Sequence, residues 1–215
     1  MLRAWCLCGL LAFGAAGCVT DKDPARFDAF SENKMASVGR SVESARDAYV
    51  RAHDQIVEAV RTIRERAWTG SRPQEAYDLT RRLLARCESR LHSASRRLVS
   101  ARAAAAEHFD QWGRELDDYE DKTLREESRR SLNEYKARFR TVAEEMERAG
   151  KEMEKVVAAI QDQMLFIKHH RNDAALPPRP QPEVDWEARM NPMMGQTDLA
   201  VLRADEFIAR TRPGR

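Results

Sequence analysis

Histidine and carboxylate side chains occur close together at two places where they could bind a metal ion. Glu88 and His92 lie four residues apart on one face of a predicted helix, and Glu107 directly precedes His108. A di-iron helical bundle requires Glu-x-x-His pairs on two helices, together with further Glu residues that face inward. That spacing does not occur in the sequence. We therefore interpret these groups as solvated side chains on helix surfaces, and we expect no metal and no other cofactor.

Two further groups could carry chemistry, but helix structure explains them better. His169 and His170 are adjacent near the end of a predicted helix, where they diverge by about 100° and suit the negative end of the helix dipole. Cys87 lies at an apolar position of a helix, which predicts a buried, unreactive thiol. Glycine-rich phosphate loops, nucleophile elbows and zinc-ligand spacings do not occur in the sequence. We therefore predict that the protein is not an enzyme.

The first 17 residues have the pattern of an export signal. Arg3 precedes a short apolar segment, residues 4–13, which is too short to span a membrane as a helix. The signal ends in Ala15-Ala16-Gly17-Cys18, which resembles a bacterial lipobox with Ala15 at the position where leucine is usual. This pattern predicts cleavage before Cys18 and attachment of lipid, such as palmitate, to that residue. The alternative is ordinary signal-peptidase cleavage near Ala16 or Gly17, which would release a soluble periplasmic protein.

The other cysteines and the residue after Cys18 agree with an anchored protein. Cys6 and Cys8 would leave with residues 1–17, so Cys87 has no disulfide partner in a lipidated mature chain. Valine at position 19, rather than aspartate, favours sorting to the outer membrane. We therefore predict a lipid-anchored envelope protein that faces the periplasm, with the membrane as one of its partners.

The composition indicates long solvated helices. The 215 residues are 33% charged, 42% hydrophobic and 7% aromatic, which is typical of helices with a narrow apolar stripe. The net charge is +2 and the basic and acidic residues are interleaved, so we expect no nucleic-acid partner. Arginine pairs such as Arg81-Arg82 are interpreted as part of solvated faces, with binding of anionic lipid or cell-wall polymers as the alternative.

Three long segments carry apolar residues at spacings that mostly alternate between three and four, which predicts coiled-coil helices. Turn-forming residues 69–73 and a capping box from Thr123 to Glu126 separate them. Short connections make neighbouring helices antiparallel. We therefore predict an all-α protein, a long antiparallel three-helix coiled-coil bundle over residues 33–172, joined to the anchor by a tether, residues 18–32. The predicted apolar seams are Met35, Val38, Val42, Ala45, Tyr49, Ala52, Ile56, Ala59 and Ile63; Leu84, Cys87, Leu91, Ala94, Leu98, Ala101, Ala105, Phe109, Trp112, Leu116 and Tyr119; and Leu132, Tyr135, Phe139, Val142, Met146, Ala149, Met153, Val156 and Ile160.

The C-terminal part of the chain has a different character. Residues 173–196 are predicted to form a Pro-rich irregular linker, because Leu176-Pro177-Pro178-Arg179-Pro180-Gln181-Pro182 favours a semi-rigid extended segment. Residues 197–215 are predicted to form a short C-terminal helix and tail. Within them the helix is expected from Asp198 to Arg210, with Thr197 as its cap.

Three stretches resemble a known bacterial family. They are Val38-Gly39-Arg40-Ser41-Val42, the segment from Trp112 to Leu132 (WGRELDDYEDKTLREESRRSL) and the segment from Asp162 to Ala175 (DQMLFIKHHRNDAA). Over about residues 30–176 the chain is similar to the uncharacterised family catalogued as domain of unknown function 2959 (DUF2959). The resemblance implies an exported helical protein and transfers no catalytic residue. It also implies another long helix after the third, where this chain has its Pro-rich segment.

These features predict a non-enzymatic envelope lipoprotein that acts as a structural spacer or adaptor through its bundle and contacts an envelope protein. The alternative is a periplasmic chaperone or membrane-stress protein that binds non-native chains or lipid, and self-association into a homo-oligomer is left open. Trp112 and Tyr119 are candidates for contact with the membrane, and Phe166 for contact with a partner. For the apolar residues around Trp112, the favoured expectation is that Phe27 and Phe30 cover them, and contact of Trp112 and Tyr119 with the membrane is the alternative.

Overall fold

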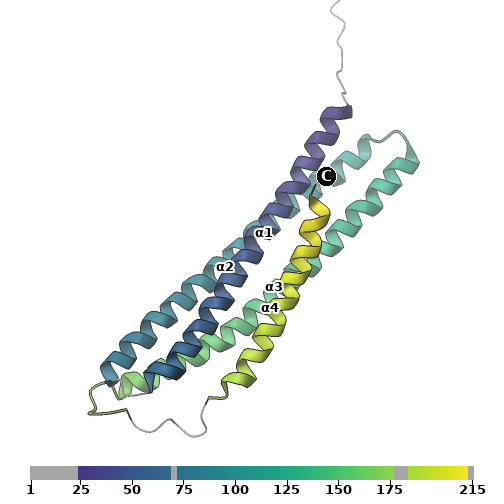
Figure 1. Ribbon diagram of the computed structural model, residues 1–215. Coiled ribbons are helices and arrows are strands. Elements are labelled where there is room, and N and C mark those ends of the chain that lie inside the picture. The colour runs from purple at the N-terminus through teal and green to yellow at the C-terminus, as the bar shows by residue number, and fades with distance from the viewer. Residues whose placement is uncertain (1–23, 69–71, 177–183, 213–215) are drawn as a thin grey trace, which may run out of the picture.

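The protein consists of four long helices that pack side by side (Figure 1). The computed structural model describes residues 24–68, 72–176 and 184–212, with side chains described from Met35 onward. No strand occurs in these residues, which confirms the predicted all-α bundle. The elements are α1 (Pro24–Thr62), the π-helical turn η1 (Ile63–Ala67), α2 (Pro73–Glu115), the 3-10 turn η2 (Leu116–Asp118), α3 (Lys122–His169) and α4 (Trp186–Thr211).

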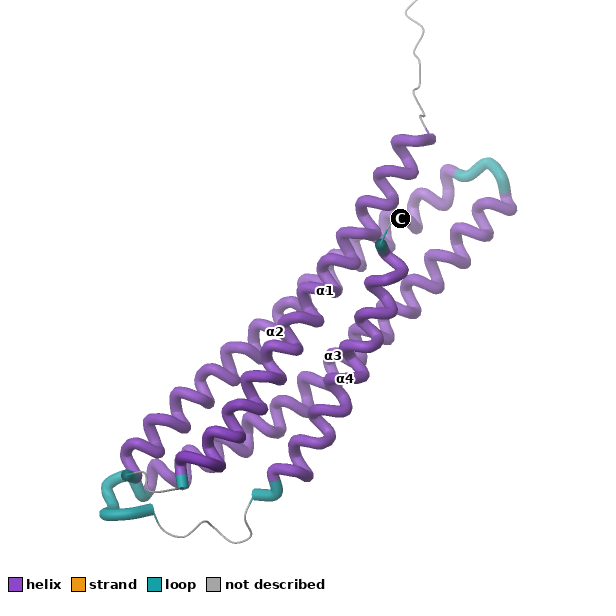
Figure 2. Tube along the Cα trace, viewed as in Figure 1, coloured by secondary structure: helices purple, strands orange, loops and turns teal. Residues whose placement is uncertain are grey.

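The helices form an antiparallel rod in which each helix has two close neighbours (Figure 2). α2 packs against α1 and α3, and α4 also packs against α1 and α3. At about 1.5 Å per residue, α3 alone is roughly 70 Å long. The beginning of α1 and the α2–α3 turn lie at one end of the rod, which we call the proximal end (Figure 1). The end of α1, the beginning of α2 and the beginning of α4 lie at the other end, which we call the distal end.

Most of the core of the rod is formed by the apolar seams predicted from the sequence, and α4 adds further buried residues. Every predicted seam residue of the first segment, from Met35 in α1 to Ile63 in η1, is buried. In the second segment the predicted seam residues Leu91, Trp112, Leu116 and Tyr119 are only partly buried. The seam of α3 is buried from Leu132 to Ile160 apart from Tyr135, which is partly buried. Each large apolar side chain contributes about 1.5–3 kcal/mol when it is fully buried, so these seams supply much of the stability of the rod. Among the described residues, no helix combines the length and apolar character needed to cross a membrane.

The starts of two helices differ from the prediction. α1 begins at Pro24, so the predicted tether over residues 18–32 is helical for most of its length. Proline suits the first turn of a helix, because its missing N–H would have no partner there. The extension carries α1 further toward the proximal end than the predicted bundle boundary at residue 33.

The cap of α3 also differs from the prediction. The helix begins at Lys122, and Asp121 is its cap instead of Thr123. The Asp121 carboxylate accepts hydrogen bonds from the backbone N–H groups of Thr123 at 2.7 Å and Leu124 at 3.1 Å. Both aspartate and threonine are good cap residues, but Asp121 has the extended backbone that a cap requires. The predicted capping box is therefore wrong.

α4 is the largest departure from the prediction. The interpretation of residues 173–196 as an irregular linker is wrong from Trp186 onward, because α4 continues from there to Thr211. Asp185 caps the helix by accepting a hydrogen bond from the Ala188 N–H at 2.9 Å. Thr197, the predicted cap, lies inside the helix and is buried. The bundle therefore has a fourth long helix in place of a short C-terminal one.

Packing outweighs a proline inside α4. Pro192 lies within the helix, where a proline costs about 3 kcal/mol relative to alanine. Trp186, Met193 and Phe207 on the same helix are buried, and each contributes about 1.5–3 kcal/mol. The free energy contributed by burial of these three side chains exceeds the free-energy cost of the proline. Tertiary contacts therefore keep the segment helical.

The C-terminal half of α4 is fixed to α3 by aromatic contacts. The ring of Phe207, which is 1% exposed, meets those of Tyr135 and Phe139 edge-on, with centroid distances of 6.5 and 5.8 Å. The Tyr135 hydroxyl donates a hydrogen bond to the carbonyl oxygen of Arg210 at 3.2 Å. These contacts make α4 part of the core near the proximal end.

Polar contacts connect the same half of α4 to α1. Arg46 of α1 forms an ion pair with Asp205, and Arg212 lies 3.5 Å from Glu43. Gly39 of α1 packs directly against Thr211, which is 5% exposed. The two helices approach closely there because Gly39 has no side chain.

Candidate functional site

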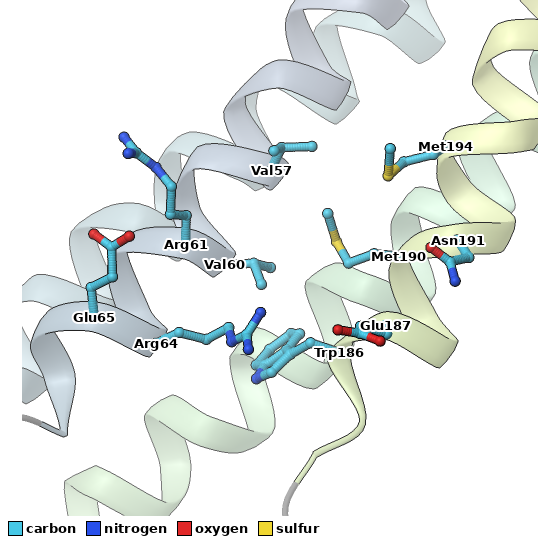
Figure 3. A pocket seen from close by; sticks show the side chains of 10 residues that line it. All are labelled: Val57, Val60, Arg61, Arg64, Glu65, Trp186, Glu187, Met190, Asn191 and Met194. Carbon is cyan, nitrogen blue, oxygen red and sulfur yellow. The ribbon is translucent and has the colours of Figure 1, made fainter.

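A groove of about 620 Å³ lies between α1 and α4 at the distal end (Figure 3). We call it the α1–α4 groove. Val57 and Val60 of α1 and Trp186, Met190 and Met194 of α4 form its apolar walls. A concave site of this volume with apolar walls is typical of places that receive a ligand or the side chains of a partner. The unbranched methionine side chains can adapt to occupants of different shape.

Charged side chains surround the α1–α4 groove. Arg61 and Arg64 contribute from the side of α1, and Glu187 contributes from α4. Arg61 donates two hydrogen bonds to Glu58, at 2.6 and 3.0 Å, and this contact lowers the pKa of the Glu58 carboxyl. Arg64 extends toward the indole ring of Trp186 (Figure 3). The rim carries both signs of charge and therefore does not favour a ligand of one charge. The apolar walls are the part of the groove that would select an occupant.

Both helices that line this groove depart from regular α-helical geometry beside it. α1 passes into the π-helical turn Ile63–Ala67, and α4 contains Pro192. π-helical turns are frequent at functional sites, and an interior proline removes a backbone hydrogen bond and kinks a helix. Such irregularities interrupt regular knobs-into-holes packing. Both irregularities therefore lie at the one end of the rod where α1 and α4 leave this groove between them.

A second groove, of about 550 Å³, lies between α2 and α3, and we call it the α2–α3 groove. Tyr49 of α1, which is 3% exposed, reaches into it from the core. Gly150 of α3 makes room for Tyr49, because a Cβ atom at residue 150 would lie 3.3 Å from the hydroxyl oxygen. Arg102 of α2 donates a hydrogen bond to Glu147 of α3 at 2.8 Å and connects the two walls. Burial raises the pKa of Tyr49 to about 12, so its hydroxyl stays protonated at neutral pH.

The two residues predicted to contact the membrane lie near the α2–α3 turn at the proximal end. Trp112 is partly buried, its Nε1 donates a hydrogen bond to the Ser128 hydroxyl at 2.9 Å, and its ring lies 5.9 Å from that of Tyr135. The backbone carbonyl of Tyr119 accepts a hydrogen bond from Arg125 at 2.6 Å. Both residues therefore contribute to contacts between the ends of α2 and α3, and their contact with a membrane stays a prediction.

Phe207 of α4 joins the aromatic cluster beside Trp112 without covering all of the apolar residues there, since Leu124 is 53% exposed. α4 brings Phe207 against Tyr135 and Phe139, and the Phe139 ring in turn lies 6.1 Å from that of Phe109. The predicted cover by Phe27 and Phe30 involves side chains outside the described ones. Phe207 reaches this cluster because α4 belongs to the bundle.

Phe166, the predicted partner contact, lies at the distal end. Its ring is 5.9 Å from that of Trp68 and 4.9 Å from that of His170. The neighbouring Leu165 is 39% exposed. Phe166 therefore joins the end of α3 to the end of α1, and its contact with another protein stays a prediction.

The remaining candidate residues lie in separate places. Cys18 is outside the described residues. Cys87 is fully buried with its Sγ 3.7 Å from the Gln55 carbonyl oxygen, as predicted, and burial raises the pKa of its thiol to about 12. Glu88 and His92 line the α2–α3 groove. The interpretation of His108 as a solvated side chain is wrong, because His108 is 6% exposed and packs beside the rings of Phe109 and Trp112. No group of three or more His, Cys, Asp or Glu residues in the described parts of the chain is arranged to hold a metal ion.

The fold and the two grooves define an elongated antiparallel four-helix bundle with lateral grooves. The chain belongs to the family described as "Protein of unknown function (DUF2959)", whose profile matches residues 26–211. This match confirms the resemblance and extends it through α4, so the fourth helix is part of the region that defines the family. Comparison with curated proteins gives no match, and comparison with solved structures gives none either.

Proposed function

We propose that the protein is a non-enzymatic envelope lipoprotein that acts as a spacer or adaptor. In this proposal, lipid on Cys18 holds the proximal end of the rod at the outer membrane, and the distal end presents the α1–α4 groove to an envelope protein. The observation that carries the proposal is the separation of these two features along α1. The segment from Cys18 to Pro24 reaches at most about 20 Å when fully extended. Val57 in the groove wall lies roughly 50 Å of helix beyond Pro24.

A chaperone that holds non-native chains is the alternative. Such a protein needs a contiguous exposed apolar surface. The large apolar residues that are exposed in the described part of the chain are instead distributed over three helices and both ends of the rod: Val99, Leu124, Leu165, Met194 and Leu202. This distribution supports a rod with local contact sites over a holdase.

The lipid anchor is tested by replacing Cys18 with serine. We expect cells that express the unchanged protein to incorporate radiolabelled palmitate into it and to retain it in the outer-membrane fraction. The Cys18→Ser variant should lose the label and appear in the soluble periplasmic fraction, because serine has no thiol to accept the lipid. Cys87→Ser is the matched control and should keep the label. Unlabelled wild-type protein in the soluble fraction would contradict the anchor.

The adaptor role is tested by photocrosslinking in cells. A photoreactive phenylalanine analogue at Met194, a groove residue that is 43% exposed, should crosslink to one defined envelope protein. The same analogue at Arg130, whose side chain is 73% exposed near the start of α3, should not. A ladder of many different products from Met194 would favour the chaperone alternative instead. Equal crosslinking from both positions would exclude the groove as the contact site.

A further inference from the structure

The hydroxyl of Tyr49 is a polar group that no other residue in the described parts of the chain uses, and it lies at the α2–α3 groove. Tyr49 is 3% exposed, and within the described parts of the chain no hydrogen bond involves its hydroxyl. The side chain is therefore almost wholly enclosed, while its hydroxyl oxygen stays accessible from the groove. Because the hydroxyl reaches the α2–α3 groove, a molecule bound there can replace water as its hydrogen-bond partner.

The walls of the groove carry hydrogen-bonding side chains of both kinds. Arg102 and His92 line it from α2, and Glu147 and Glu154 line it from α3. The wall formed by α2 extends from Glu88 to Arg102, which is about 20 Å of helix. Hydrogen-bond donors and acceptors therefore occur along the whole length of this elongated groove. Because acids and bases both line it, the groove is suited neither to a polyanion nor to a polycation.

Apolar surface lies between these polar groups. Leu98 and Val157 are nearly buried at the sides of the groove, and Val99 is 61% exposed beside them. A ligand that fits has apolar C–H faces as well as many hydroxyl groups. A glycan chain combines both kinds of surface, and charged side chains form stronger hydrogen bonds with its hydroxyls than neutral ones do.

A docked helix fits the groove less well. The backbone groups of a helix are used within the helix itself, so its apolar side chains would cover the Tyr49 hydroxyl and leave it unpaired. The Arg102–Glu147 hydrogen bond also crosses from one wall to the other, where a helix lying along the groove would have to break it. A chain of sugar rings can instead hydrogen-bond to this pair.

We propose that the α2–α3 groove binds a neutral, hydroxyl-rich glycan chain and that the Tyr49 hydroxyl is a recognition group at its base. The proposal goes beyond the spacer or adaptor role and does not depend on the lipid anchor. Its failure and the failure of the anchor are therefore separate results.

The test is calorimetric titration of the full chain with two probes, a hexamer of β-1,4-linked N-acetylglucosamine and a hexamer of glucose. We expect saturable binding of at least one of them. Tyr49→Phe should weaken that binding by roughly tenfold, because one buried hydrogen bond is lost, while the urea midpoint of unfolding stays the same or rises. Tyr135→Phe is the matched control: its hydroxyl is bonded to the Arg210 carbonyl away from the groove, and its removal should leave glycan binding unchanged. Preference for one hexamer shows whether acetamido groups are recognised together with hydroxyls.

A second variant tests glycan binding without changing a core residue such as Tyr49. Val99→Glu changes an exposed wall residue, so it should fold normally and still weaken binding by narrowing the groove. Failure of both hexamers to bind the unchanged protein would overturn the proposal. Unchanged affinity in both Tyr49→Phe and Val99→Glu would also overturn it, because the glycan would then bind elsewhere and water would be the partner of the hydroxyl.

Discussion

Replacing Phe207 with alanine should lower the free energy of unfolding by about 3–5 kcal/mol, the usual cost of truncating a buried phenylalanine. Phe207 is 1% exposed and contacts the rings of Tyr135 and Phe139. Truncation would remove the contacts of this ring with Tyr135 and Phe139 and leave a cavity between α3 and α4. Urea denaturation followed by far-UV circular dichroism measures the change.

A substitution on the outer face of the same helix provides the control. Leu202 is 52% exposed, so Leu202→Ala should change the free energy of unfolding by less than about 0.5 kcal/mol. A combined Phe139→Ala and Phe207→Ala variant should lose less than the sum of the two single losses, since the rings contact each other. An unchanged urea midpoint in Phe207→Ala would mean that α4 is not part of the cooperative core.

The first three helices could be predicted because one physical pattern dominates them. Residues such as Ala52, Ile56 and Met153 recur at the three–four spacing of a coiled coil, and burial follows directly from that spacing. Pro73 also begins α2 as expected, since proline is favoured in the first turn. The first residue of a helix is harder to predict where two residues favoured as caps lie close together, as Asp121 and Thr123 do. Backbone geometry then determines which of them is the cap.

α4 was missed because local composition was given more weight than spacing. Asn191, Pro192 and Gly195 are residues that favour turns. Trp186, Met193, Thr197, Ala200, Ala204, Phe207 and Thr211 are nevertheless buried at spacings of three, four or seven. That pattern is the signal that could have identified the helix and, with it, the groove residues Met190 and Met194. The free-energy cost of Pro192 in a helix is offset only when α4 packs against the apolar surfaces of α1 and α3.

The candidate sites could not be predicted from spacing alone. Periodicity correctly predicted that Tyr49 is buried, but not that its hydroxyl reaches the space between α2 and α3. That depends on the arrangement of three helices around it and on the absence of a side chain at Gly150. The α1–α4 groove is likewise lined in part by the π-helical turn Ile63–Ala67, which no residue pattern in the sequence indicated.

Replacing Gly39 with alanine should destabilise the protein by about 1–3 kcal/mol, the usual cost of overpacking a core. In a helix interior the same change is normally favourable by about 1 kcal/mol, because alanine has the higher helix propensity. Here the added Cβ would overlap the Thr211 hydroxyl and lie 3.0 Å from the Thr211 Cβ. Thr211 is buried and its hydroxyl donates to the Ile208 carbonyl at 2.9 Å, so rotation of the side chain does not relieve the clash. The last turn of α4 would have to move away from α1.

Gly113 and Gly195 have no close neighbours, so alanine substitutions there are controls for the effect of helix propensity in Gly39→Ala. A Cβ atom at Gly113 or Gly195 would meet nothing within 4 Å, so alanine at either position should raise the free energy of unfolding by about 1 kcal/mol. Gly39→Ala should shift the urea midpoint in the opposite direction and increase amide hydrogen exchange in the last turns of α4. Adding Thr211→Gly should recover part of the loss, because it removes the three atoms that lie nearest to the new methyl group. If Gly39→Ala were stabilising like the two controls, α1 and α4 could not approach each other as closely as the contact between Gly39 and Thr211 requires.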